Sequence, residues 1–252
     1  MRPMPKNGVR SRNLFDPKSD KPYKLSRSKL ELFLKCPRCF YLDRRVGIGQ
    51  PQGPAFTLNT AVDGLLKKEF DRHRAAREPH PLMREHGINA VPFQHPDLDV
   101  WRDNFHGVQY LHPPTNLLVT GAVDDVWVDG DDTLFVVDYK STSTEKEISL
   151  DDQWKQAYKR QMTIYQWLLR GNEFTVSNTG YFVYVNAKKD RDGFDGRLEF
   201  SAQVIPHEDT DAWVHGAVVN AHRCLVDASP PPSATECEWC AYRQATRDAG
   251  NL

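Results

Sequence analysis

The chain has 252 residues, of which 39% are hydrophobic, 11% aromatic and 27% charged. This composition supports one large domain or two very small ones, and it excludes an intrinsically disordered chain. No run approaches the ~20 consecutive apolar residues that a membrane span needs. The first residues also lack the apolar segment of a secretory signal. We therefore expect an intracellular, cytoplasmic protein without a membrane partner.

The charges are unevenly distributed along the chain. Residues 1–50 hold 13 Lys and Arg against 4 Asp and Glu, whereas the whole chain has a net charge of −1. A basic segment joined to an acidic body predicts a polyanionic partner such as nucleic acid. The alternative for residues 1–23 is a basic, flexible tail that serves solubility.

The first half of the chain predicts helices and one irregular stretch. Ser26 is a suitable cap for a helix that runs to about Lys35. A loop is expected over residues 47–56, and apolar residues at helical spacing predict a second helix over 57–76. Residues 78–116 contain many Pro and His, so we expect irregular structure there with one short strand.

The second half alternates strands and helices. Two β-branched runs around an acidic Asp-Gly turn predict an antiparallel hairpin, and aromatic or alternating runs predict two more strands. The expected strands cover residues 117–129, 133–140, 180–187 and 197–205, and the expected helices cover 151–170, before a stop at Gly171, and 211–228. This order of elements predicts a mixed α/β fold.

One segment carries two carboxylates and a lysine whose spacing predicts a metal-binding site. Asp138 and Lys140 are two residues apart on a strand and therefore point to the same face. The predicted hairpin places Asp124, on its first strand, beside them. Carboxylates of this kind bind Mg²⁺ or Mn²⁺. Such an ion lowers the pKa of a bound water and offsets charge on a phosphoryl transition state, and a neighbouring lysine orients the water or stabilises developing charge.

Gly121-Ala122-Val123-Asp124 is followed by Val136-Val137-Asp138-Tyr139-Lys140-Ser141-Thr142, and the next helix carries Gln161 and Tyr165 on one face. These motifs resemble those of the RecB-like branch of the PD-(D/E)XK nuclease superfamily. The resemblance implies a restriction-endonuclease-like mixed central sheet flanked by helices, in a single domain over 24–245 between tails at 1–23 and 246–252. It implies the catalytic residues Asp124, Asp138, Lys140, Gln161 and Tyr165.

One position departs from the family pattern. RecB-like enzymes often place a metal-binding His in the early helix, and this chain has Asp63 at the matching position. Because Asp is itself a hard-metal ligand, we expect Asp63, Asp124 and Asp138 to hold the ion. Altered or lost metal affinity is the alternative, and Glu69 is a fallback ligand.

The cysteines form two pairs about 200 residues apart, Cys36 and Cys39 at one end and Cys237 and Cys240 at the other. In an intracellular chain such pairs indicate metal ligation, here a staple joining the two ends. AddB-type and CRISPR-adaptation exonucleases, which the Ser26–Arg38 segment resembles, bind an iron–sulfur cluster through one early and three late cysteines. Two symmetric pairs favour zinc on their own, whereas the resemblance favours [4Fe–4S], which we expect, with Zn²⁺ as the alternative. The fifth cysteine, Cys224, is expected in the core.

These features together predict a metal-dependent DNA nuclease, and they favour an exonuclease acting on single strands or ends. Its context would be repair, recombination, or CRISPR or phage DNA processing, with a separate helicase or CRISPR or recombination proteins as partners. The alternatives are a catalytically inactive nuclease-fold subunit that binds or scaffolds DNA, and a zinc-stapled interaction module. Phosphate contacts are expected from Arg38, Lys155, Lys159 and Arg160, and from Lys24, Arg27, Lys29, Arg44 and Arg45.

Overall fold

The computed structural model describes residues 9–51, 53 and 56–250, which form two compact units. The first unit comprises residues 1–54, 111–120 and 212–252, and the second comprises residues 55–110 and 121–211. The predicted mixed α/β class, with a mixed sheet flanked by helices, is confirmed. No described helix has both the length and the apolar character needed to cross a bilayer.

The first unit is mainly helical. Strand β1 (Tyr23–Ser26) pairs in parallel with β4 (Leu117–Gly121). Their three-stranded sheet has the order β1-β4-β3, and residues 108–110 of β3 (Val108–His112) are assigned to the second unit. The helices of this unit are α1 (Arg27–Lys35), α2 (Pro37–Tyr41), a π-helical turn (Leu42–Val46), α7 (Ala212–Val226) and α8 (Glu238–Ala249). Helix α8 therefore continues past residue 245, the predicted end of the domain.

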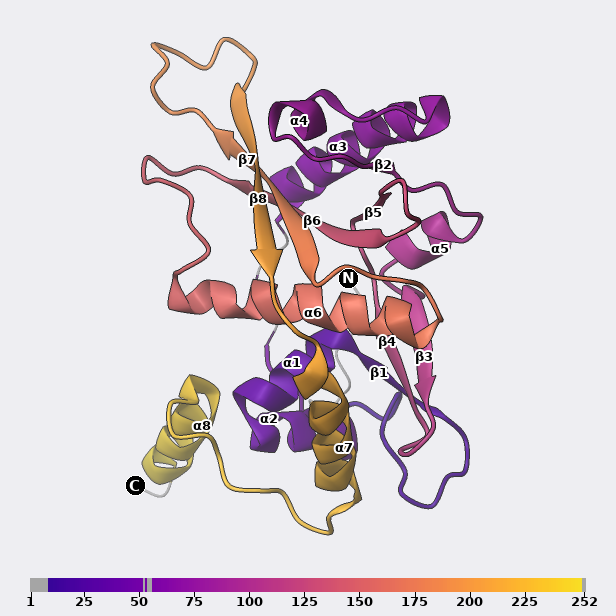
Figure 1. Cartoon of the computed structure of the whole chain (residues 1–252). Helices are drawn as coiled ribbons and strands as arrows, with labels where there is room; N and C mark the ends of the chain where they lie inside the picture. Colours follow the sequence, from indigo (N-terminus) through magenta and orange to yellow (C-terminus); the bar gives the residue numbers. More distant parts are fainter. Residues whose placement is uncertain (1–8, 52, 54–55, 251–252) are drawn as a thin grey trace. The chain divides into compact units, whose positions relative to one another are not determined.

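The second unit is built on a five-stranded mixed sheet of order β2-β5-β6-β7-β8 (Figure 1). Its strands are β2 (Val91–Pro92), β5 (Asp125–Val128), β6 (Leu134–Thr142), β7 (Thr179–Ala187) and β8 (Phe200–Glu208). Its helices are α3 (Thr57–Ala76), α4 (Pro81–Glu85), α5 (Leu98–Arg102), a 3₁₀ turn (Gln153–Lys155) and α6 (Gln156–Gly171). Strands β6 and β7 are parallel, so they need a crossover connection, which contains α6.

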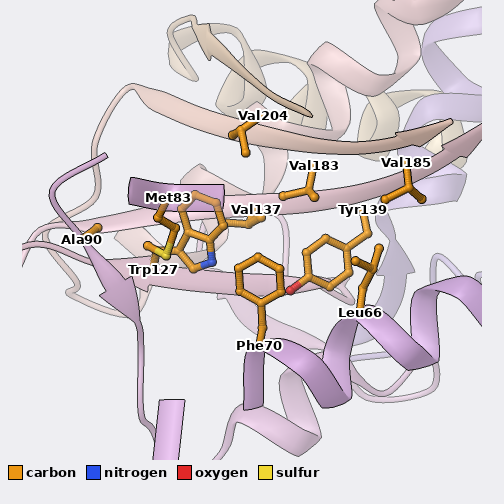
Figure 2. Packing of buried hydrophobic residues seen from close by; sticks show 10 residues of the cluster. All are labelled: Leu66, Phe70, Met83, Ala90, Trp127, Val137, Tyr139, Val183, Val185 and Val204. Carbon is orange, nitrogen blue, oxygen red and sulfur yellow. The ribbon is translucent and has the colours of Figure 1, made fainter. Parts of the chain in front are cut away.

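The core of the second unit lies between α3 and one face of this sheet (Figure 2). Leu66 and Phe70 are one helical turn apart, so both point from α3 toward the sheet. The Phe70 ring centroid is 5.6 Å from that of Trp127 and 5.5 Å from that of Tyr139. Because Val137 and Tyr139 fill this core, the alternate residues of β6 point to the opposite face of the sheet.

Two expectations about secondary structure are wrong. The strand predicted over residues 117–129 is two strands, β4 and β5, which belong to different sheets. The chain breaks between them because the backbone N–H of Val123 donates to the Trp101 carbonyl, and the Asp124 carbonyl accepts from Arg102 Nε, instead of continuing a ladder. Residues 78–116 are also more regular than predicted, since they contain α4, α5, β2 and β3.

Part of the predicted N-terminal tail packs against the first unit. Residues 1–8 lie outside the described residues, as do 52, 54 and 55 of the predicted 47–56 loop. Phe15 is buried, and its backbone N–H donates to the Arg44 carbonyl over 2.8 Å. Arg10 pairs with the Asp43 carboxylate over 3.0 Å. Residues 9–22 are thus tied to the unit by specific contacts although they form no helix.

Candidate functional site

Strand β6 places Asp138 and Lys140 together on the sheet face opposite the α3 core. Asp138 is fully buried, and its carboxylate forms an ion pair with the ammonium of Lys140, whose side chain is 16% exposed. Strand β6 continues two residues past Lys140, so the pair lies within the strand rather than at its end. A buried carboxylate next to a partly accessible ammonium is the first element of the site.

Asp124 lies beside this pair, although it occupies the bend before β5 rather than the predicted strand. Its Oδ2 accepts a hydrogen bond of 2.9 Å from the backbone N–H of Tyr139, which fixes the carboxylate against β6. The β5–β6 hairpin makes this contact possible, because Asp125 pairs with Val137 in the antiparallel register. Both carboxylates and the lysine predicted from the motif therefore come together.

Helix α6 contributes Gln161 and Tyr165 to the same place. The Gln161 amide nitrogen donates to Asp138 Oδ1 over 2.7 Å and lies 3.1 Å from the Tyr165 hydroxyl. Tyr165 is buried against Gly121, where an added Cβ would lie 2.5 Å from the tyrosine ring. Gly121 is thus required for the close approach that positions Gln161 over Asp138.

Asp63 and Lys67, one turn apart on α3, face Asp124. Lys67 Nζ is 2.9 Å from Asp63 Oδ2 and 3.6 Å from Asp124 Oδ1, so it bridges two of the three predicted metal ligands. The sequence did not single out Lys67. The fallback ligand Glu69 points elsewhere, because its carboxylate pairs with His80 over 3.0 Å.

The electrostatics of the site favour capture of a cation. Burial, together with the nearby Asp124 carboxyl, raises the pKa of Asp138 to about 7 despite the Lys140 ammonium. Burial and Asp124 also raise the pKa of Asp63. Burial alone would lower the pKa of Lys140, but Asp138 and Asp124 outweigh it and raise that pKa. Lys140 therefore stays charged. The nearby carboxylates repel one another, and a bound divalent ion would offset that repulsion.

A second set of charged residues contacts the backbone of Asp124. The Asp125 carboxylate is fully buried and pairs with Arg74 and, over 2.8 Å, with Arg102. Arg102 also donates to the Asp124 backbone carbonyl over 3.0 Å and pairs with Asp71 over 2.8 Å. Two arginines and two carboxylates make this set neutral. It fixes the backbone that presents Asp124.

The Tyr139 hydroxyl completes this network and yields a prediction. It donates to Asp125 Oδ2 over 2.7 Å. Tyr139→Phe removes the donor and leaves a buried carboxylate oxygen short of a partner, so we expect a loss of about 1–3 kcal/mol in the free energy of unfolding. Urea denaturation measures it. Tyr181→Phe, in the same core, is the matched control, and equal stability of both variants would contradict this role of Tyr139.

The predicted phosphate-binding residues lie in both units. Arg38 belongs to α2 of the first unit, where Lys29 and Arg44 already pair with the buried Asp43. Lys155 is buried and its ammonium binds the Asp152 carboxylate over 2.8 Å, so it closes the turn before α6. Lys159 and Arg160 follow on α6 and are partly exposed.

The four paired cysteines gather in the first unit. All four sulfur atoms lie within 4.8 Å of one another, and no other described group of three or more potential ligands meets this criterion. Cys39 Sγ is 3.6 Å from Cys237 Sγ and from Cys240 Sγ, and Cys36 Sγ is 3.8 Å from Cys240 Sγ. Burial raises the pKa of Cys36, but backbone N–H groups of Ala234 and Cys39 and the neighbouring thiols outweigh it and lower it to about 7. Cys224 is buried apart from this set, in α7.

The second unit thus combines a mixed sheet with a buried Asp-x-Lys pair, a second carboxylate and a helical glutamine. The model of the PD-(D/E)XK nuclease superfamily matches residues 58–245. The chain belongs to this superfamily, whose members are typically metal-dependent nucleases. This membership excludes an interaction module unrelated to nucleases.

The other comparisons add little to this assignment. No curated protein matches the chain. Among the solved structures that match is the crystal structure of SSO0001, at 17% sequence identity and a TM-score of 0.37. The match covers 90% of this chain and 86% of that chain.

Proposed function

We propose that the protein is a metal-dependent DNA nuclease of the RecB-like branch, with its active site at Asp124, Asp138, Lys140, Gln161 and Tyr165. The observation that carries this proposal is the buried Asp138–Lys140 pair on β6, with the Gln161 amide 2.7 Å from Asp138 Oδ1. A buried carboxylate and ammonium kept accessible on one side are costly for stability and are typical of a catalytic site.

Two of the three predicted ligands fit a divalent cation. The Asp124 carboxylate is fixed against β6 beside the Asp138–Lys140 pair. Asp63 lies farther off: Lys67 stands between it and Asp124, and the three carboxylates do not all offer oxygens within 4.8 Å of one another. Hard oxygen donors of this kind suit Mg²⁺ or Mn²⁺. When bound, the ion would supply positive charge beside the phosphate and lower the pKa of a water.

The other side chains of the site would position the phosphate, the attacking water and the metal ligands. Lys140, held as an ammonium by Asp138, offers a charge to the phosphate oxygens and orients the attacking water. Gln161 holds Asp138 Oδ1 in place, and Tyr165 supports Gln161. Lys159 and Arg160 stand on the same helix as Gln161, where they can bind backbone phosphates.

Metal binding should depend on pH through Asp138. Because the pKa of its carboxyl is about 7, a proton competes with the cation below that pH. We expect the apparent Mn²⁺ affinity to rise about tenfold per pH unit up to pH 7 and to level off above it. Titration of Mn²⁺ followed by electron paramagnetic resonance measures this, and Asp138→Asn should weaken Mn²⁺ binding at every pH. A flat profile in the wild-type protein would refute the assignment.

We propose that cleavage starts at single strands or DNA ends, in repair, recombination, or CRISPR or phage DNA processing, with a separate helicase or recombination proteins as partners. The test compares linear and covalently closed circular DNA, each single- and double-stranded, in Mn²⁺ or Mg²⁺ and in EDTA. An exonuclease degrades linear DNA in metal and leaves the circles intact. Cleavage of the circles would show an endonuclease instead.

A catalytically inactive DNA-binding or scaffolding subunit is the second candidate. It is favoured by Lys67, whose ammonium lies between Asp63 and Asp124 where a cation would bind. The same substrates distinguish the two, because this candidate predicts binding without cleavage in every metal. Lys67→Met would then leave cleavage absent, whereas in an active nuclease it should lower the Mn²⁺ concentration required for activity.

We propose that the four paired cysteines hold one metal centre. The sulfur separations of 3.6 and 3.8 Å support a single tetrahedral Zn²⁺, whose bonds of about 2.3 Å place sulfurs about 3.8 Å apart. In a [4Fe–4S] cluster, which the sequence resemblance favours, each sulfur binds a different iron, so the thiolates stand farther apart. Metal analysis and the visible absorption of anaerobically purified protein separate the two.

A further inference from the structure

An exposed tryptophan stands beside the proposed active site. Trp154 is 62% exposed, and it belongs to the 3₁₀ turn that precedes α6. The Lys155 ammonium closes this turn by binding the Asp152 carboxylate and the Ser149 carbonyl, and it lies 5.0 Å from the Trp154 ring centroid. Most of the Trp154 side chain remains open to solvent.

Tyr158 connects this ring to the proposed catalytic lysine. The Trp154 and Tyr158 ring centroids are 5.5 Å apart, with the planes at 81°. Lys140 Nζ lies 4.6 Å from the Tyr158 centroid, a distance typical of a cation–π contact. The Tyr158 ring thus lies next to the Lys140 ammonium, and the exposed Trp154 ring lies next to Tyr158.

We propose that Trp154 and Tyr158 form a stacking site for an unpaired nucleobase of the strand whose phosphate lies at Lys140. An aromatic face beside a phosphate-binding ammonium suits a nucleotide, because base and phosphate are joined in one ligand. In a duplex the base faces are covered by their neighbours, so the site selects single strands or frayed ends. This inference rests on the proposed function, which it extends to the substrate.

The test uses variants of Trp154 and a matched control. Trp154→Ala removes the ring, and Trp154→Phe keeps an aromatic face. Phe194→Ala removes another exposed aromatic residue, from the β7–β8 connection of the same unit. Fluorescence anisotropy in EDTA measures the affinity for a labelled single-stranded oligonucleotide, and for the same backbone with abasic positions, over a range of salt concentrations.

We expect Trp154→Ala to weaken binding of the normal oligonucleotide by about 5- to 150-fold, with Trp154→Phe partly restored and Phe194→Ala unchanged. The dependence of affinity on salt should keep its slope, because no phosphate contact is lost. Trp154→Ala should bind the abasic oligonucleotide with the same affinity as the wild-type protein. Unchanged affinity, a reduced salt slope or an equal loss on the abasic backbone would each overturn the proposal.

These outcomes separate the stacking site from the nuclease activity. If wild type cleaves DNA and Trp154→Ala keeps both its affinity and its KM, the stacking site alone is refuted. If wild type binds through Trp154 but cleaves no DNA in any metal, the nuclease proposal fails and the stacking site stands.

Discussion

Replacing Lys140 with alanine is expected to lower the rate of DNA cleavage at saturating DNA by about 10²–10³-fold. The variant removes the ammonium that would face the phosphate. It also leaves the buried Asp138 carboxylate without its ion-pair partner, which raises the pKa of Asp138 further and weakens metal binding. Single-turnover cleavage of a labelled oligonucleotide in saturating Mn²⁺ measures the loss.

Two further variants make this result specific. Lys68→Ala removes an exposed lysine of α3 and should cleave as wild type does. Lys140→Arg keeps the charge but not the compact ammonium, so it should restore little activity. Cleavage by Lys140→Ala at the wild-type rate would contradict a catalytic role of Lys140.

Loss of a paired cysteine is expected to release α8 from the first unit. Helix α8 buries none of its residues, and Trp239 and Tyr242 remain exposed. The contacts of Cys237 and Cys240 with Cys36 and Cys39 therefore anchor it. Because a structural metal contributes its binding energy to folding, its loss removes the main reason for α8 to stay docked.

Cys240→Ser should abolish metal content and expose the α8 amides to rapid hydrogen exchange. Cys36→Ser should do the same from the other end of the staple, whereas Cys224→Ala should keep both the metal and the protection of α8. Hydrogen exchange read by mass spectrometry resolves the effect by segment. Wild-type metal content and α8 protection in both serine variants would refute the staple.

Local sequence patterns predicted much of this structure because they report local geometry. The helix expected over residues 57–76 coincides with α3. Residue alternation placed Asp138 and Lys140 on one face of β6, and a one-turn spacing aligned Gln161 with Tyr165. Each of these relations needs only the period of a strand or helix.

Relations between distant segments could not be predicted in the same way. Asp125 looked like an ordinary strand residue, yet it pairs with Arg74, which is 51 residues away, and with Arg102 from a segment expected to be irregular. Asp124, predicted on a strand, lies in a bend because its carbonyl accepts a hydrogen bond from Arg102 of the same network. Lys67 carried no motif, and its place between two carboxylates depends on how α3 packs on the sheet.

The most direct test of the proposed metal-dependent active site is a Mn²⁺ titration of cleavage. Wild-type protein and Asp138→Asn would be incubated with labelled linear single-stranded DNA, from excess EDTA to saturating Mn²⁺. We predict cleavage by wild type that rises with Mn²⁺ and is absent in EDTA, and none by the variant. Cleavage in EDTA, or equal cleavage by Asp138→Asn, would contradict a metal-dependent site at Asp138.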